Sequence, residues 1–200
     1  MGSTQVFQPL TREDKISVVL YRTGIVISAV IIAGLAFLLT AYAYAGRTNA
    51  GLSGEVLIYG LFASVGMSVF FIHLYIGKIK VFLKNLYYLS LGCLAALLII
   101  GKGSLSSAFL LEPYSLLLLL PLSGCLGFVT AKEAFCFKLF EGYLLAMIMP
   151  FYLLLVASGG LSGRGPSWGL VLIAVLLVIF TVRKVRQPLA YDIGDKSAYQ

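Results

Sequence analysis

Charge is what this sequence has least of. Only 12% of its 200 residues are Asp, Glu, Lys or Arg, whereas about a quarter of a typical soluble domain is charged. Hydrophobic residues make up 60% of the chain and the mean hydropathy is +0.98. A soluble fold of this size cannot bury so much apolar surface. The composition therefore excludes a soluble globular domain and predicts a polytopic membrane protein.

Metal-ligating residues are also scarce. The chain has one histidine, His73, and three cysteines without CxxC spacing, at Cys93, Cys125 and Cys136. Zinc and iron–sulfur sites need several such ligands at set spacings, as does a disulfide framework. We therefore expect no metal site. The net charge of +7 is distributed as a membrane topology signal, and nucleic acid is not an expected partner.

Long neutral runs are what the sequence does contain. A charge at bilayer depth costs about 2.5–3.5 kcal/mol, and a spanning helix needs roughly 20 apolar residues. Six runs are free of charge: 23–46, 56–77, 85–101, 113–131, 142–163 and 165–182. They predict an all-α membrane protein, a bundle of about six transmembrane helices. A re-entrant hairpin in place of the third and fourth spans is the alternative. The predicted parts are an interfacial segment (1–22), the transmembrane domain (23–182) and a tail (183–200).

The loop charges predict the orientation of this bundle. With six spans, one side carries 12 Lys and Arg residues and the other carries 3. Positively charged loops stay on the cytoplasmic side. Both termini are therefore predicted on the cytoplasmic or stromal side, called the inner side here. Thr11 and Asp14 resemble a capping box, so a helix is expected to begin there, lie along the inner surface and enter the first span.

Small residues and prolines indicate how the helices pack. Gly60, Ser64 and Ser68 form a small-xxx-small ridge that allows close helix approach, and we expect this ridge to face lipid and dock a partner. Pro121 and Pro150 remove backbone donors and should kink the fourth and fifth spans. Paired broken helices can also frame a substrate site in a transporter, which is one alternative function.

His73 is the first candidate for chemistry. A neutral imidazole can serve as the axial ligand of a haem or a chlorophyll. It can also be a structural residue that caps a neighbouring helix, which is the interpretation we favour. Chlorophyll, carotenoid or lipid are conceivable cofactors, but the sequence requires none of them.

The segment KEAFCFKLFEG, from Lys132 to Gly142, places charges and a thiol among aromatic residues. Its charges are spread around a helical wheel, so we expect a segment wedged between neighbours, with Lys138 and Glu141 paired at (i, i+3). Acid–base chemistry by His73, Glu133 and Glu141 at the inner interface is an alternative. Without a second histidine we favour a structural or docking loop and assign no catalytic residue.

Two further polar segments belong to the inner side. Lys78, Lys80 and Lys84 could attract anionic lipid or an acidic partner. The tail carries Asp192 and Asp195 and is interpreted as a docking segment, a fold-back onto the inner surface, or a disordered end. With Lys132, Glu133, Lys138 and Glu141, these residues form the predicted docking surface. No predicted span has a charge at its centre, which disfavours proton relays and ion-coupled transport.

Four blocks together resemble a known family: LTREDKISVVLYRTG, HLYIGKIK, GFVTAKEAFCFKLFEGYLL and RQPLAYDIGDKS. The chain resembles an uncharacterised family of small integral membrane proteins found chiefly in cyanobacteria and plants. That family has no assigned catalytic residues. The resemblance implies an oxygenic phototroph and a thylakoid membrane. The leading hypothesis is a non-catalytic accessory subunit or assembly factor of a photosynthetic or electron-transfer complex. The alternatives are a transporter of an uncharged or lipid-like solute and an enzyme acting on lipid, quinone or pigment.

Overall fold

Helices account for the regular structure in the part of the chain that the computed structural model describes, residues 11–45 and 50–193. Six helical segments are long and apolar enough to cross a membrane, which confirms the expected all-α bundle. The spans are α1 (Arg12–Ala45), α2 (Ala50–Phe71), α3 (Gly77–Ile100), a fourth built from the 3₁₀ helix η1 (Pro113–Leu119) and α5 (Leu120–Phe137), α6 (Phe140–Ala157) and α7 (Gly165–Val185). Two short helices complete the fold, α4 (Leu105–Leu111) and α8 (Ala190–Ile193).

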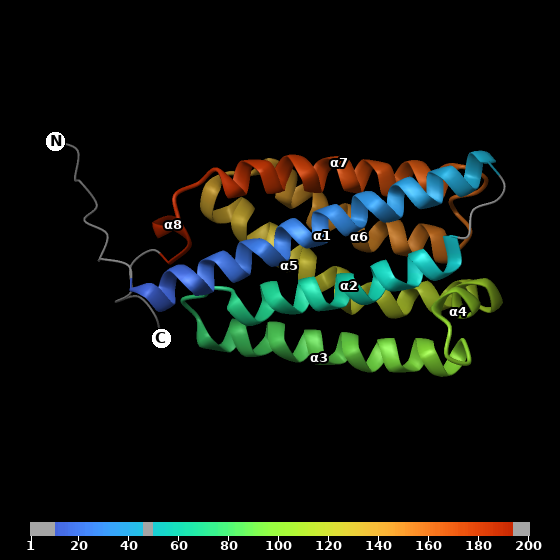
Figure 1. Cartoon of the computed structure of the whole chain (residues 1–200), viewed down its shortest axis with the longest axis horizontal. Coiled ribbons are helices and arrows are strands. Elements are labelled where there is room, and N and C mark those ends of the chain that lie inside the picture. The colour runs from blue at the N-terminus through green and yellow to red at the C-terminus, as the bar shows by residue number, and fades with distance from the viewer. Residues whose placement is uncertain (1–10, 46–49, 194–200) are drawn as a thin grey trace.

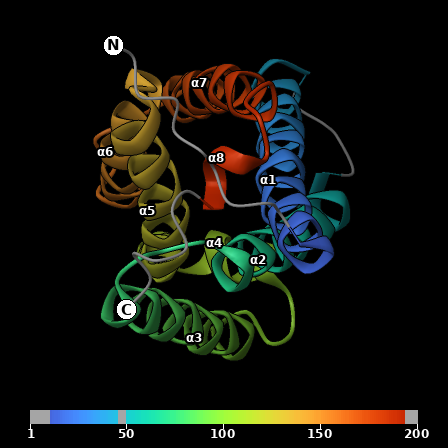
Figure 2. The same ribbon diagram turned by 90° about the vertical axis from the view of Figure 1, so that its left-hand side faces the viewer.

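The spans run roughly along one axis (Figure 1). Viewed from one end, α1 and α7 lie side by side, α5 and α6 form the next wall, and α2 and α3 close the lower side (Figure 2). Helix α3 is at the edge of the bundle, and α8 lies across the end that faces the viewer. We call this end, where α1 begins, α5 and α7 finish and α8 lies, the charged end. Because α8 lies near the start of α1, the first and last described residues share one end of the bundle.

Helix α1 begins where the capping box predicted. The Thr11 amide donates to Asp14 Oδ2 at 2.9 Å, and the Asp14 amide donates to Thr11 Oγ1 at 3.2 Å. The helix then continues without a break to Ala45, so position 22 is not a structural boundary. At 1.5 Å per residue, 34 residues extend about 50 Å, against about 30 Å of bilayer core. The first turns of α1 therefore project beyond the other spans at the charged end.

The small-residue ridge of α2 packs inside the bundle, which corrects the expectation that it faces lipid. Ser64 and Ser68 are buried against α1. Ser28 Oγ lies 2.8 Å from Ser64 Oγ, and Ser68 Oγ donates to the Tyr21 carbonyl at 3.3 Å. A Cβ on Gly24 would stand 2.6 Å from the Ser64 carbonyl oxygen. The ridge therefore brings two backbones of this chain together and is not available to a partner.

Pro121 marks a change of helix type within the fourth span. It occupies the first turn of α5, directly after the 3₁₀ helix η1. Proline has no N–H to continue an α-helical ladder, but it is tolerated in a first turn, where that donor has no partner in the helix. Pro150 lies inside α6. The fourth span is thus helical throughout in place of a re-entrant hairpin, and its 3₁₀ part lies at the end away from the charged end.

The middle of the bundle is free of formal charge. No Asp, Glu, Lys or Arg lies in the central third of any of the six described spans. Most of the described charges gather at the charged end, and a smaller set, Glu55, Lys102, Glu112 and Arg164, belongs to the other end. Charged side chains that could bind a partner are therefore concentrated at the charged end.

Candidate functional site

A buried network of ion pairs joins four helices at the charged end. Lys184, near the end of α7, is fully buried and pairs with both Glu133 of α5 and Asp192 of α8. Arg22 of α1 donates from Nε to Asp192 Oδ2 at 2.6 Å. Lys132 donates to Glu133 Oε1 at 2.8 Å. We call these five residues the ion network. Charges removed from water at this depth persist only when paired, so the network fixes the relative positions of α1, α5, α7 and α8.

Arg22 also holds the turn between α7 and α8. Its Nη1 donates to the Gln187 carbonyl at 2.6 Å, and its Nη2 donates to the Pro188 carbonyl at 3.0 Å. These carbonyls follow the end of α7 and have no later amide of that helix as a partner. A guanidinium with five donors can serve a carboxylate and several carbonyls at once. The described part of the tail therefore folds back onto the bundle, as one of the three sequence interpretations proposed.

Aromatic side chains enclose the ion network. Tyr21 is fully buried and donates its hydroxyl to Glu133 Oε1 at 2.7 Å. Lys184 Nζ lies 4.1 Å from the centre of the Phe137 ring, and that ring stacks on Tyr191 with 6.2 Å between centroids. Cations are attracted to aromatic faces, more strongly when desolvated. Phe137 thus shields Lys184 from water while contributing to its stabilisation.

A second ion pair lies closer to the surface, and it corrects the pairing expected from the sequence. Glu141 of α6 accepts hydrogen bonds from Arg183 of α7 at 2.7 and 2.8 Å. Lys138 is exposed and adopts a left-handed conformation, φ 55°, as the C-cap of α5. Glu141 therefore ties α6 to α7 rather than pairing with Lys138.

The segment KEAFCFKLFEG is mostly helix and not a loop. Helix α5 continues to Phe137 and α6 begins at Phe140. Glu133 is fully buried while Phe135 is 80% exposed, so the segment is wedged between neighbours as expected.

Likewise, the lysines expected in a loop, Lys78, Lys80 and Lys84, lie in the first two turns of α3. Charged residues at the ends of spans can remain in the helix because their long side chains extend to the interface.

The sequence interpretation missed three members of this site. Arg22 served only to delimit the first span and in the count of loop charges, Lys184 only in that count, and Tyr21 was not considered. A usable signal existed for Arg22: it lies ten residues past the start of a helix that the capping box already located. Nothing local marks Lys184 as different from its exposed neighbour Arg183. Of the docking residues predicted in the tail, Asp192 joins the ion network, and Asp195 lies outside the described residues.

His73 lies in the connection between α2 and α3 and contacts α1. Its Nε2 is 3.2 Å from Ser17 Oγ, whose hydroxyl donates to the Asp14 carbonyl at 2.8 Å. This contact occupies His73 Nε2, whichever of the two atoms donates. Its other nitrogen, Nδ1, has no partner among the described residues and less than 1 Å² of accessible surface. A haem or chlorophyll ring cannot approach that nitrogen, so this arrangement does not fit an axial ligand.

The environment of His73 makes a prediction about pH. Burial lowers the pKa of His73, and the nearby charges of Lys132 and Lys80 lower it further, against weaker opposing effects of Asp192 and Asp14. Below the unfolded pKa of about 6.5, the unfolded chain binds the proton more readily than the folded one. Stability should therefore fall as pH decreases from about 7 to 5. In thermal unfolding, His73→Gln should lose less stability over this interval than the parent protein. An equal loss in both proteins would contradict the prediction.

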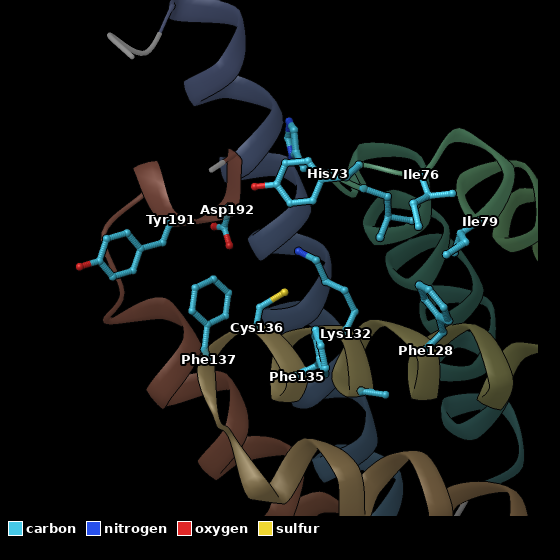
Figure 3. Close-up of a pocket in the computed structure, with 13 residues that line it drawn as sticks. His73, Ile76, Ile79, Phe128, Lys132, Phe135, Cys136, Phe137, Tyr191 and Asp192 are labelled. Atoms are coloured by element: carbon cyan, nitrogen blue, oxygen red, sulfur yellow. The ribbon is translucent and has the colours of Figure 1, made fainter. Parts of the chain in front are cut away.

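Several hollows are present in the described structure, and two of them bear on the predicted functions. The first, about 810 Å³, lies at the charged end between the 73–76 connection, α3, α5 and α8; we call it the end pocket (Figure 3). The second, about 300 Å³, lies in the middle of the bundle and is lined by apolar side chains with Ser123 and Tyr152. It lies near both prolines, since Leu122 and Met149 line it. Its lining does not provide a polar pathway.

The residues considered for acid–base chemistry are not brought together. His73 lines the end pocket, whereas Glu133 and Glu141 do not. Both carboxylates are engaged by cations in separate ion pairs. Within the described residues, no group of three or more His, Cys, Asp and Glu side chains could hold a metal ion. His73, Glu133 and Glu141 therefore do not form one acid–base site.

The comparison with known families agrees with this picture of an integral membrane protein. The chain matches the uncharacterized integral membrane protein family DUF2301 over residues 67–200. The match includes three of the four blocks that carried the resemblance, and the block from Leu10 to Gly24 lies outside it. No curated protein and no solved structure matches the sequence. Since the match covers more than half of the sequence, the chain belongs to the DUF2301 family of uncharacterized integral membrane proteins.

Proposed function

We propose that this protein is a non-catalytic accessory subunit or assembly factor that binds a larger membrane complex. The setting implied by the sequence resemblance is the thylakoid, with the charged end on the cytoplasmic or stromal side and a photosynthetic or electron-transfer complex as the partner. The observation that carries the proposal is the outward face of α3. Helix α3 is the least buried of the six spans and lies at the edge of the bundle (Figure 2).

The outward face of α3 contains small residues where lipid contact alone gives no reason for them. Gly92 and Ala95 are exposed, Ala96 is half-buried, and a Cβ on Gly92 would meet nothing within 4 Å. Glycine in a helix costs about 1 kcal/mol relative to alanine. In membranes, such positions allow the backbone of a second helix to approach closely, which is a main source of helix association there. We therefore propose a transmembrane helix of the partner complex as the occupant of this face.

The charged end supports the same function by providing a rigid polar surface. The ion network fixes α8 and the ends of α5 and α7. Exposed charges lie at the same end of the bundle, among them Lys78 at the start of α3 and Lys138 at the end of α5. A surface that is already ordered loses little conformational entropy on binding a partner. Docking at this rim would add specificity to the helix contact made by α3.

The alternative functions have weaker support. Transport through the bundle would use the central cavity, whose apolar lining suits only a lipid-like solute. Enzymatic acid–base chemistry would need His73, Glu133 and Glu141 in one site, and their positions do not provide this. Neither alternative explains the small residues on the exposed face of α3.

Substitution of Gly92 by leucine tests the proposal. The side chain enters open space, so the fold should persist, but the bulk should prevent close helix approach. After purification of a tagged chain in mild detergent, the parent protein should co-migrate with a chlorophyll-protein complex, and Gly92→Leu should reduce that fraction by roughly tenfold, equivalent to about 1.4 kcal/mol. Gly54→Leu is the matched control, because Gly54 of α2 also has open space around it. Migration of the parent protein as a monomer, without a chlorophyll-protein partner, would contradict the proposal.

A further inference from the structure

The end pocket combines a long apolar wall with a polar end. Phe128, Ile79 and Phe135 line it along α3 and α5, and Ile76 adds to this wall from the connection before α3. Phe135 is 80% exposed and Ile76 is 53% exposed. In a bilayer, apolar side chains this exposed at the charged end of spanning helices would be available to acyl chains. The pocket is thus open to an amphiphilic molecule.

The polar end of the pocket is supplied by α5 and α8. Figure 3 shows Lys132 and Cys136 directed from α5 into the space that Asp192 borders from α8, with His73 on the opposite side. The Lys132 ammonium uses one donor on Glu133 Oε1, and an ammonium has three. Its side chain keeps 13% of its surface accessible. Lys132 can therefore donate to a ligand while it remains paired with Glu133.

The charge around the pocket favours an anion. The ion network contains three cations, Arg22, Lys132 and Lys184, and two carboxylates, Glu133 and Asp192, so the sum is 3 − 2 = +1 within the described structure. Asp192 borders the pocket, but Arg22 and Lys184 both engage its carboxylate. Lys80 of α3 and Asp14 of α1 both lie close enough to act on His73, with opposite signs, so together they leave this sum unchanged. A buried ion network with a net positive charge is stabilised by an anion in the pocket beside it.

We propose that the end pocket binds an anionic phospholipid, with its phosphodiester at Lys132 and its acyl chains along Phe128, Ile79 and Phe135. A free phosphate could pair with Lys132 but would leave this apolar wall uncovered. A zwitterionic lipid would cover the wall but would bring its own cation toward Lys132 and Lys80. An anionic lipid satisfies the charge and the apolar surface together, at a height where headgroup and chains meet.

Native mass spectrometry of the full chain, released from micelles with equal amounts of phosphatidylglycerol and phosphatidylcholine, tests this proposal. The parent protein should retain phosphatidylglycerol roughly fivefold over phosphatidylcholine, the preference expected from one lysine near an anionic headgroup. Lys132→Gln should abolish the preference. Lys138→Gln, which removes an exposed lysine from the same end of α5, should keep it. Ala131→Phe fills the pocket without changing its charge and should reduce retention of both lipids.

The outcomes separate the lipid from other sources of phosphate. Equal retention of the two lipids by the parent protein would overturn the proposal, as would an unchanged preference in folded Lys132→Gln. If Lys132→Gln does not fold, Ala131→Phe decides: undiminished retention there overturns the proposal and reduced retention supports it. Thermal stabilisation by inorganic phosphate equal to that by phosphatidylglycerol would assign the site to a soluble anion and overturn the lipid assignment.

Discussion

Replacing Lys184 with methionine is expected to lower the free energy of unfolding by about 3–5 kcal/mol. Methionine preserves much of the length and apolar volume of lysine but removes its charge. Glu133 and Asp192 would then face each other in the buried network without the cation that both contact. Removing one partner from a buried ion pair is costly because the remaining charge stays desolvated. Thermal or denaturant unfolding in detergent would measure the loss.

Arg183→Met provides the matched control for this prediction. Arg183 is adjacent in sequence, carries the same charge and also pairs with a carboxylate, Glu141, but its side chain is 50% exposed. Exposed ion pairs contribute about 0–1 kcal/mol. The two substitutions should therefore differ by several-fold in their effect on stability. Equal effects would show that burial does not set the strength of the Lys184 contacts.

Gly24→Ala is expected to destabilise the contact between α1 and α2 by about 1–3 kcal/mol or more. The added Cβ would stand 2.6 Å from the Ser64 carbonyl oxygen and 2.8 Å from the Ser68 amide nitrogen. Both are backbone atoms in a helix, so they cannot move aside as a flexible side chain could. The helices would have to separate, and the hydrogen bond between Ser28 and Ser64 would lengthen.

The same substitution at Gly92 gives the control. A Cβ there meets nothing within 4 Å, so Gly92→Ala should be neutral or should stabilise α3 by up to about 1 kcal/mol through helix propensity. Unfolding of the two variants in the same detergent would compare them directly. If Gly24→Ala proved as harmless as Gly92→Ala, the close packing of α1 on α2 would be wrong.

The spans could be predicted from sequence because exclusion of charge from a bilayer is a strong, local signal. The start of α1 could be predicted because Thr11 and Asp14 satisfy each other within one turn. The span ends were less predictable. The charged residues Lys78, Lys80, Lys84, Lys132 and Glu133 all lie within helices. A charged side chain near the end of a span can extend to the interface or pair with a residue of another span.

The site was harder to predict because its contacts join distant parts of the chain. Arg22 and Asp192 are 170 positions apart, and hydropathy contains no information about which charges meet. The pairing of Glu141 was unpredictable for the same reason. The sequence predicted Lys138, three positions away, as its partner, but its partner in the structure is Arg183, forty-two positions away. The ridge of Gly60, Ser64 and Ser68 was recognised as a packing surface, but its pattern could not show whether the opposing helix belonged to this chain.

The ion network supports one of the two proposed binding sites, the end pocket, and is separate from the other, the exposed face of α3. It fixes α8 over the end of the bundle, which forms one wall of the end pocket. It leaves the exposed face of α3 unaffected, since none of its members lies on α3. Lipid binding at Lys132 and helix docking at Gly92 can therefore be removed separately, and each variant reports on its own site.

A double-mutant cycle between Lys184→Met and Glu133→Gln is the most direct test that buried charges hold this end of the bundle together. If the two side chains pair as described, the unfolding free energy lost by the double variant should be smaller than the sum of the single losses by more than about 1 kcal/mol. Additive losses, within about 0.5 kcal/mol, would mean that the two charges do not interact and would contradict the ion network.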